Sequence, residues 1–290
     1  MFAQDLKVQL NINIGEEVKL KCRNNTCISG NHCRELLSND KKAFLKLCDG
    51  KRQGWNSQLK KENRLHHCEF YSPHPVFYWQ PMKVEWLASD PKVGQFIEFA
   101  SREELHALWD HAPKAFRSQV VGTNKTTIKS DVRTGTQSWF PDNHWITKRL
   151  SLRIQNLINM NYETSDDWQI GSYGIGGHYS VHHDYFEKDY AQSQWFHKRG
   201  YHNRLATFMI YLADVELGGY TAFPRMNIFV KPVMGNAIFW TNLHSDGEGQ
   251  NITLHGGCPV LLGNKKIANK WIYYGGQMLR FPCLDAFRKP

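Results

Sequence analysis

Two histidines and one aspartate in this chain have the residue types and spacing of a metal site. His182 and Asp184 lie two residues apart in the stretch from Tyr173 to Phe186, and His255 follows far downstream. Alternate residues of a β-strand point to the same face, so an imidazole and a carboxylate at such positions can bind one side of a metal ion. Two histidines and one carboxylate on one face suit a non-haem iron(II) ion, and they leave coordination positions open for a bidentate co-substrate and dioxygen.

The His-x-Asp pair is weak evidence when it is taken alone. The chain contains 14 histidines, so such a pair also arises by chance. On a strand, His183 has the opposite parity from His182, and we expect it to point away from the metal. His178 shares the parity of His182, but as a surface residue or a neighbour of the site it needs no metal.

Lys265 is a candidate for binding the far carboxylate of a metal-bound 2-oxo acid. A compact ammonium group with three donors suits that task. A lone lysine is usually a solvated surface residue, but this one has an informative context. It follows an apolar run that begins next to His255, and the turn residues Gly263 and Asn264 come directly before it. The turn is expected to direct Lys265 back toward the metal-binding strands.

The elements that must position these residues are short strands preceded by helices. Helices are expected at 34–47, from residue 102 onward after a capping box of Ser101 and Glu104, and at 148–160. A strand is expected early, at 8–14, and another at 93–99. From Asp167 onward, apolar runs alternate with turn residues, at 168–173, 179–185, 205–212, 228–230, 237–240, 259–262 and 270–274. Helices first and short strands later predict an α+β chain with a sandwich or jelly-roll core.

The composition is that of a folded protein with one large domain. Of the 290 residues, 41% are hydrophobic, which is enough to build a core. The net charge of +9 fits several anionic partners, but no compact run of Lys and Arg indicates nucleic acid. No apolar stretch is long enough to span a membrane. Residues 1–20 do not have the pattern of a signal peptide, so either the protein is cytosolic or the leader is absent from this sequence.

The seven cysteines favour an oxidising compartment. Five of them lie in the first 68 residues, which predicts a cysteine-rich accessory region at 1–75 before a catalytic domain at 76–290. A zinc site is the alternative, but no Cys-x2-Cys unit occurs. Glycosylation sequons begin at Asn24, Asn124 and Asn251 and add a little weight to a secretory location.

A series of further motifs occurs in a fixed order. They are Arg133-Thr134-Gly135, Tyr173 to Gly177, Tyr179 to Phe186, Asn203 to Thr207, Gly218 to Pro224, Gly235 to Trp240, Gly247 to Gly249, His255 to Lys265, Asn269 to Trp271 and Gly276 to Cys283. In this order the chain resembles the catalytic domain of the prolyl 4-hydroxylase α-subunit family, the collagen-type Fe(II)/2-oxoglutarate dioxygenases. The resemblance covers roughly residues 80–283.

The resemblance implies a double-stranded β-helix (jelly-roll) core and a role for each matching residue. It makes His182, Asp184 and His255 the iron ligands, and Lys265 the residue that binds 2-oxoglutarate. Further residues match by position. Tyr173 and Thr221 would line the 2-oxoglutarate pocket, and Arg133, Tyr179, Arg204, Trp271 and Tyr273 would contact the proline-bearing peptide. Tyr273 stands where some relatives have histidine.

The resemblance also implies the activity, the cofactors and the surroundings. The expected reaction is 4-hydroxylation of peptidyl proline with Fe(II), 2-oxoglutarate and dioxygen, supported by ascorbate, in the endoplasmic reticulum or secretory pathway. Disulfides Cys258–Cys283 and Cys48–Cys68 are expected, as is a proline-containing or collagen-like substrate, and a protein disulfide isomerase subunit is a candidate partner.

Two other functions fit the same residues. One is a dioxygenase that acts on another peptidyl residue or on a non-collagen protein. The other is a non-catalytic jelly-roll subunit, against which the complete set of His182, Asp184, His255 and Lys265 argues. The long collagen-type subunits carry further domains before the catalytic domain, whereas about 75 residues precede it here. This difference weakens the expectation of tight binding to long collagen chains and of the usual tetramer.

Overall fold

The computed structural model describes most of the catalytic region and one earlier helix. The described residues are 38–50, 67–118, 120–121, 127–128, 133–186, 202–277 and 280. The strand expected at 8–14, the cysteines Cys22, Cys27, Cys33 and Cys283, and the sequons at Asn24 and Asn124 lie outside them.

A nine-stranded sheet forms the larger layer of the molecule. Its strands, in spatial order, are β1 (His67–Tyr71), β2 (Met82–Ser89), β3 (Lys92–Ile97), β14 (Ala237–Thr241), β10 (Arg204–Tyr211), β17 (Lys265–Tyr273), β8 (Trp168–Tyr173), β7 (Thr136–Phe140) and β4 (Phe116–Arg117). Every neighbouring pair is antiparallel. Strands from both ends of the described sequence therefore meet in one sheet.

A four-stranded antiparallel sheet packs against the large one. Its order is β13 (Ile228–Val230), β12 (Thr221–Phe223), β15 (His255–Gly257) and β9 (Tyr179–His182). Two short pairs complete the strands, β11 (Leu217–Gly218) with β16 (Val260–Leu262) and β5 (Val120–Val121) with β6 (Thr127–Ile128). The apolar side chains between the two sheets include Met209, Phe223, Trp240 and Ile267. The fold is thus β-rich and mostly antiparallel.

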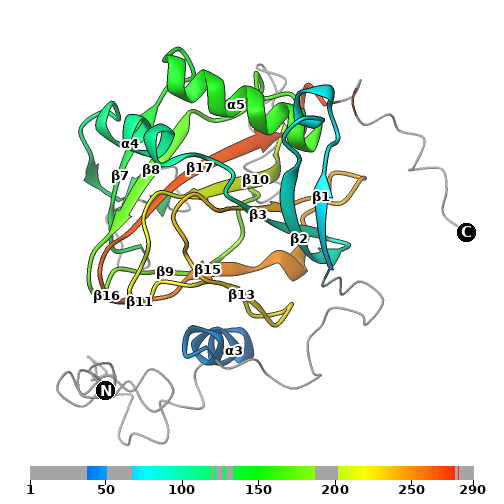
Figure 1. The fold of residues 1–290 in the computed structure, drawn as a ribbon. Helices are drawn as coiled ribbons and strands as arrows, with labels where there is room; N and C mark the ends of the chain where they lie inside the picture. Colours follow the sequence, from blue (N-terminus) through cyan, green and yellow to red (C-terminus); the bar gives the residue numbers. More distant parts are fainter. Residues whose placement is uncertain are drawn as a thin grey trace, which may run out of the picture.

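Helices cover the outer faces of both sheets, as Figure 1 shows. Helices α4 (Arg102–Asp110) and α5 (Trp145–Ile158) lie over the large sheet, where Leu105, Leu108, Leu150 and Ile154 are buried against it. Helix α3 (Asn39–Cys48) lies on the opposite side of the molecule, below the small sheet (Figure 1). Short 3-10 helices, η2 (Pro75–Phe77) and η3 (Asn251–Thr253), occur in the connections.

The expected helices and most of the expected strands are confirmed, with shifted ends. The capping box at the start of α4 is present: the Ser101 hydroxyl accepts from the Glu104 N–H, and the Glu104 carboxylate accepts from the Ser101 N–H. The sequence patterns did not indicate β1, β2, β4, β5, β6, β7, β11, β12 or β15. Two of these, β12 and β15, are three-residue strands that contain too few positions to show an alternating pattern.

The domain boundary at residue 75 stays a prediction. Two elements before it, α3 and β1, pack on the small sheet and join the large sheet, respectively. Among the described helices, none has the length and apolar character needed to cross a membrane.

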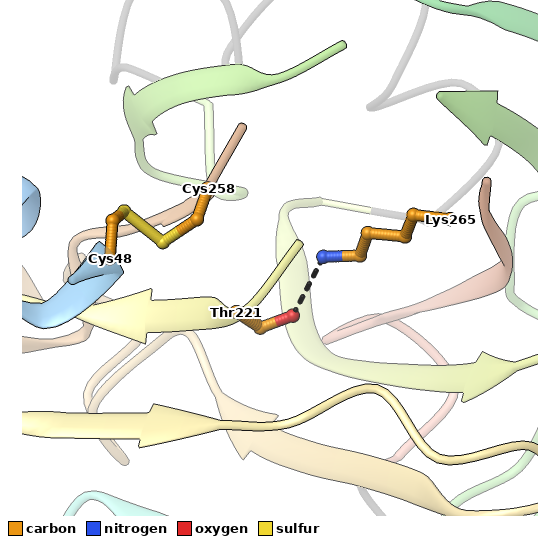
Figure 2. Close-up of a disulfide and its surroundings, with 4 residues drawn as sticks. All are labelled: Cys48, Thr221, Cys258 and Lys265. Atoms are coloured by element: carbon orange, nitrogen blue, oxygen red, sulfur yellow. Dashed lines mark hydrogen bonds between the residues drawn. A yellow bond between two sulfur atoms is a disulfide. The ribbon is translucent and has the colours of Figure 1, made fainter. Parts of the chain in front are cut away.

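The cysteine pairing expected from the resemblance is wrong in this structure. Cys48 forms a disulfide with Cys258, at a sequence separation of 210 residues (Figure 2). The physical reason is the position of α3, which ends at Cys48 against the small sheet just beyond β15. Cys68, the expected partner of Cys48, is exposed and unbridged on the edge strand β1. The expected Cys258–Cys283 bridge is excluded because Cys258 is already paired.

Neutralising Glu104 should remove a pH-dependent part of the stability. Burial tends to raise the pKa of Glu104, but hydrogen bonds from Arg153, the Ser101 N–H and Arg149 lower it to about 2, from an ordinary value of 4.5. A lowered carboxyl pKa stabilises the fold above the ordinary value, and this stabilisation is lost as the pH falls toward 2. We expect it to be about 2 kcal/mol, less than the full shift because Arg149 is well exposed.

Urea unfolding of wild type and Glu104→Gln at about pH 5.5 and about pH 3 measures this contribution. The difference between the two proteins should shrink at the lower pH. Glu103→Gln, at the exposed neighbouring position, is the control and should change the free energy of unfolding far less. A pH-independent gap between wild type and Glu104→Gln would contradict the assignment.

Candidate metal and co-substrate site

The three predicted metal ligands meet between the two sheets. His182 lies at the end of β9 directly opposite His255 in β15, and Asp184 follows β9 by two residues. Each residue offers one ligand atom, and these atoms all lie within 4.8 Å of one another. Nε2 of His182 is 3.5 Å from Oδ1 of Asp184, and Nε2 of His255 is 3.6 Å from its Oδ2. The three side chains therefore converge on one point.

Both imidazoles are oriented by backbone carbonyl groups. Nδ1 of His182 lies 2.8 Å from the Ser180 carbonyl oxygen, and Nδ1 of His255 lies 2.9 Å from that of Thr253. A proton on each Nδ1 satisfies these contacts and leaves Nε2 with a free lone pair directed at the shared point. Burial lowers the pKa of His255 to about 4, so this imidazole is neutral near pH 7.

Asp184 is held as a carboxylate by its surroundings. Burial favours its neutral form, but the positive charges of His255 and His182 in their protonated forms and of the Arg204 guanidinium outweigh burial and keep its pKa well below the usual range. The Thr207 hydroxyl donates to Oδ2 of Asp184 at 2.7 Å, and the amide of Asn242 donates to Thr207 at 2.8 Å. Sequence patterns do not reveal Thr207 and Asn242, because Thr207 is 23 residues from Asp184 in the sequence and the pairing of β10 with β14 brings Asn242 to Thr207.

Lys265 lies in the same pocket, as expected, and is 3% exposed. It opens β17 opposite Tyr173 in β8, and Nζ donates to the Thr221 hydroxyl at 3.2 Å (Figure 2). The Tyr211 hydroxyl donates to the same Thr221 oxygen at 2.8 Å. Burial lowers the pKa of Lys265 to about 7. An anion that enters the pocket beside Lys265 would therefore stabilise its charged ammonium form.

These residues fit an iron(II) ion with a chelating dicarboxylate. Two imidazoles and one carboxylate, each of which offers one ligand atom, make the donor set of an open-sided iron site. Tyr173, Thr221 and Lys265 line the same pocket as the three ligands, so an acid held at Lys265 can extend toward the metal.

Three of the expected peptide contacts form one cluster at the end of β17. The Arg204 guanidinium stacks over the Trp271 ring at 4.1 Å and donates to Oδ2 of Asp166 from Nε and Nη2, at 3.0 and 2.6 Å. The Tyr273 hydroxyl donates to Oδ1 of the same aspartate at 2.9 Å. Asp166 therefore fixes both Arg204 and Tyr273. The sequence offered one signal for it, an acidic residue just before a predicted strand, but no means to link it to Arg204.

Arg133 and Tyr179, also expected at the peptide, belong to a second cluster, which includes Tyr173. Arg133 is 4% exposed; its Nε donates to the Tyr173 hydroxyl at 2.9 Å, and Nη2 donates to Gln169 at 2.6 Å. Its guanidinium lies 4.7 Å from the Tyr179 ring centre, and that ring stacks on His182. Arg133 thus supports two tyrosines of the pocket, while Tyr179 itself lines it.

The other two histidines of the motif lie outside the ligand set. His183 stacks on Tyr185 at 4.7 Å between ring centres, and it is not in the group of converging metal-binding atoms. His178 accepts or donates at Nδ1 with the Thr134 hydroxyl, 3.1 Å away. The position of His183 agrees with the strand parity argument, and that of His178 agrees with the expectation that it needs no metal.

The comparison with protein families identifies this pocket. Residues 168–273, which carry all three candidate ligands and Lys265, match the family model of the 2OG-Fe(II) oxygenase superfamily. Residues 168–273 therefore belong to that superfamily. This family implies Fe(II) and 2-oxoglutarate as the metal and the co-substrate.

Among curated proteins, the oxygenase is similar to α subunits of prolyl 4-hydroxylases. It is 34% identical to prolyl 4-hydroxylase subunit alpha-1 of Gallus gallus over 250 residues, 84% of this chain and 47% of that protein. Identity to subunit alpha-1 of Homo sapiens is 32%, over 84% of this chain and 46% of that protein. Identity to subunit alpha-3 of Rattus norvegicus is 37%, over 72% of this chain and 38% of that protein. The chain spans about half the length of the alpha-1 relatives that it matches.

Among solved structures, the oxygenase is similar to a viral collagen prolyl hydroxylase from Paramecium bursaria Chlorella virus-1 in complex with 2OG. The identity is 28% and the TM-score 0.49, over 62% of this chain and 94% of that one.

Proposed function

We propose that this chain is a 2-oxoglutarate-dependent dioxygenase that hydroxylates peptidyl proline at C4. The observation that carries the proposal is the meeting of His182, Asp184 and His255 in one pocket with the buried cation of Lys265. The similarity to prolyl 4-hydroxylase α subunits supports proline as the target.

Each residue has a distinct task in this proposal. His182, Asp184 and His255 hold Fe(II), which when bound activates dioxygen for insertion into a C–H bond. Lys265 and the Thr221 hydroxyl bind the distal carboxylate of 2-oxoglutarate. In the balanced reaction one oxygen atom enters the proline C4–H bond, the other enters succinate, and the C1 carboxylate of 2-oxoglutarate leaves as CO2. The Thr207 hydroxyl orients the Asp184 carboxylate.

The aromatic rim is the proposed binding surface for the peptide. Trp271 and Tyr179 line the pocket, and the flat faces of such rings suit the apolar ring of proline. Arg204, stacked on Trp271, is expected to donate to a peptide carbonyl oxygen, and Asp166 and Tyr273 hold it there. Arg133 contributes indirectly, through Tyr173 and Tyr179.

A coupled assay tests the proposal. Purified chain with Fe(II), 2-oxoglutarate and a (Pro-Pro-Gly)n peptide should release succinate and form 4-hydroxyproline, both measured by mass spectrometry. Succinate formed with another peptide but never with a proline peptide would favour a dioxygenase that acts on another residue. Absence of succinate with every peptide tested, in metal-loaded protein, would favour a non-catalytic subunit.

The pKa of Lys265 leads to a second prediction, on 2-oxoglutarate binding. With a pKa near 7, Lys265 is largely neutral at about pH 8, and the carboxylate of the acid raises that pKa by favouring the charged form. Binding at pH 8 should therefore take up close to one proton, and affinity should fall as the pH rises above 7. Titration calorimetry in buffers of different ionisation enthalpy measures the uptake.

Lys265→Arg provides the matched control for this measurement, because arginine stays charged at all these pH values. Its affinity should be lower but nearly independent of pH. Equal pH dependence in the two proteins would contradict the role given to Lys265.

The remaining expectations complete the proposal. We propose that the two sheets form a double-stranded β-helix, that residues 76–290 are the catalytic domain, and that ascorbate sustains turnover. We also propose a location in the endoplasmic reticulum lumen or secretory pathway, which the Cys48–Cys258 disulfide supports because such bonds persist in oxidising compartments. Co-purification from secretory cells tests both the location and a protein disulfide isomerase partner.

A further inference from the structure

Helix α3 reaches the metal site from the back of the small sheet. The side chains of His182 and His255 lie on the face of this sheet that looks toward the large sheet, whereas α3 packs on the other face. The cluster between α3 and the sheet contains Phe44, Leu47 and Cys48 from the helix. All three are at most 6% exposed. The helix thus lies one sheet thickness away from the ligands.

On the C-terminal side of His255, α3 makes two contacts with the next residues of the chain. The Phe44 ring packs on Gly256, so closely that a Cβ atom at Gly256 would lie 2.8 Å from it. The disulfide then joins Cys48 to Cys258, three residues after the ligand (Figure 2). These two contacts restrict the movement of β15 relative to α3.

On the N-terminal side of His255, α3 acts through an ion pair. The Asp40 carboxylate accepts from Nε and Nη2 of Arg225, at 3.1 and 2.8 Å. Nη1 of the same arginine donates to the Asn251 carbonyl oxygen at 2.6 Å. Asn251 opens η3, which ends at Thr253, and the Thr253 carbonyl oxygen faces Nδ1 of His255. The segment that orients the ligand imidazole is therefore also tied to α3.

We propose that α3 is a brace for the metal site, with Asp40, Phe44 and Cys48 as positioning residues that act on His255 through its two flanking segments. The proposal rests on the metal site of the proposed function and deepens it. None of these residues touches the metal or the substrate. Because an imidazole ligand must be aimed within a narrow range, loosening its supports lowers metal affinity.

The brace makes the metal site sensitive to reduction. A dithiol delivers two electrons and two protons to the Cys48–Cys258 bond, which yields two cysteine thiols, while the dithiol itself becomes a cyclic disulfide. The covalent link between α3 and the segment after β15 is then broken, although the packing of Phe44 and the Asp40–Arg225 ion pair remain. Partial loss of metal affinity is the expected consequence.

Metal affinity of the whole chain, without 2-oxoglutarate or peptide, tests the proposal. Binding of Mn(II) as the probe is followed by the electron paramagnetic resonance signal of the free ion. Phe44→Ala, Asp40→Asn and the Cys48→Ser/Cys258→Ser double variant should each bind Mn(II) about tenfold more weakly than wild type, the range seen when partners of ligands are removed. Lys42→Ala, on the exposed face of α3, and Cys68→Ser should bind as wild type does.

Two further measurements make the result decisive. Peptide mapping of the unreduced chain should find Cys48 joined to Cys258, and a Cys48–Cys68 bridge would overturn the covalent link. Wild type reduced in place should lose Mn(II) affinity while its circular dichroism spectrum persists, and Phe44→Leu serves as a milder variant if Phe44→Ala does not fold. Unchanged Mn(II) affinity in the folded variants would overturn the proposal that α3 positions His255. Global unfolding on reduction would also overturn it, because the disulfide would then stabilise the whole fold and not the metal site in particular.

The same titration separates this inference from the proposed function. If wild type itself binds no Mn(II), the proposed metal site fails. If wild type binds and all the folded variants bind equally well, only the brace fails.

Discussion

His182→Ala is expected to lose all detectable formation of succinate and hydroxyproline. The substitution removes one of three converging ligands and leaves His255 and Asp184 to bind the metal alone. Removing even a partner of a metal ligand typically costs 10- to 100-fold, so loss of the ligand itself should lower activity by at least about a hundredfold. Succinate release measured with and without peptide, at saturating Fe(II), checks the result.

The adjacent histidine provides the control for this experiment. His183→Ala changes the same type of residue one position along, but its ring stacks on Tyr185 and lies outside the ligand group. This variant should bind Mn(II) as wild type does. Turnover that persists in His182→Ala, or equal loss in both variants, would refute the ligand assignment.

Asp166→Asn is expected to impair peptide use while sparing 2-oxoglutarate. Without the carboxylate, the largely buried Arg204 guanidinium loses the charge that holds it against Trp271. Misplacement of a substrate-orienting group by about 1 Å can cost about a hundredfold, so kcat/KM for the peptide should fall by about that factor. The unpaired cation should also lower the free energy of unfolding by about 2–3 kcal/mol.

The informative measurement is the comparison of the kinetic constants for the peptide with those for 2-oxoglutarate. KM for 2-oxoglutarate should stay near that of wild type, because Lys265 lies at the other end of β17, where its ammonium group contacts Thr221 of β12. Asp167→Asn removes an exposed carboxylate from the neighbouring residue and should leave both constants unchanged. A parallel rise in both KM values for Asp166→Asn would point to general unfolding instead of loss of a peptide contact.

Sequence reasoning found the candidate metal site because its information is local. The spacing of His182 and Asp184 predicted a common face, and the two side chains do converge, although β9 ends at His182 and Asp184 follows it. The apolar run and turn after His255 were expected to direct Lys265 inward. The structure brings these residues into one pocket with Tyr173, Tyr179, Thr221 and Trp271. Strand parity and the turn were weak evidence alone, and they gained weight through the resemblance, in which His255 and Lys265 also match.

The supporting residues could not be found in the same way, because their roles depend on strand register. Thr207 reaches Asp184, and Asp166 reaches Arg204, across distances of 23 and 38 residues in the sequence. The disulfide is a sharper case, since its partners are 210 residues apart and meet because α3 packs under β15. Pairings taken from the resemblance were wrong there, because they assumed bridges within separate parts of the chain.

A substitution in strand β17 and an insertion into it are expected to have different consequences for the pocket. Lys265, Ile267, Asn269 and Trp271 all line the pocket because they are alternate residues of one continuous strand, and Tyr273 continues the series beside Arg204. In the proposed function, a substitution at residue 273 would therefore change the peptide contact without moving Lys265, the proposed anchor of the co-substrate. Insertion of one residue between the two ends would instead turn one end of the series out of the pocket. The length of β17 thus sets the distance between the proposed co-substrate anchor and the proposed peptide contact, whereas the side chain at residue 273 can change without altering that distance.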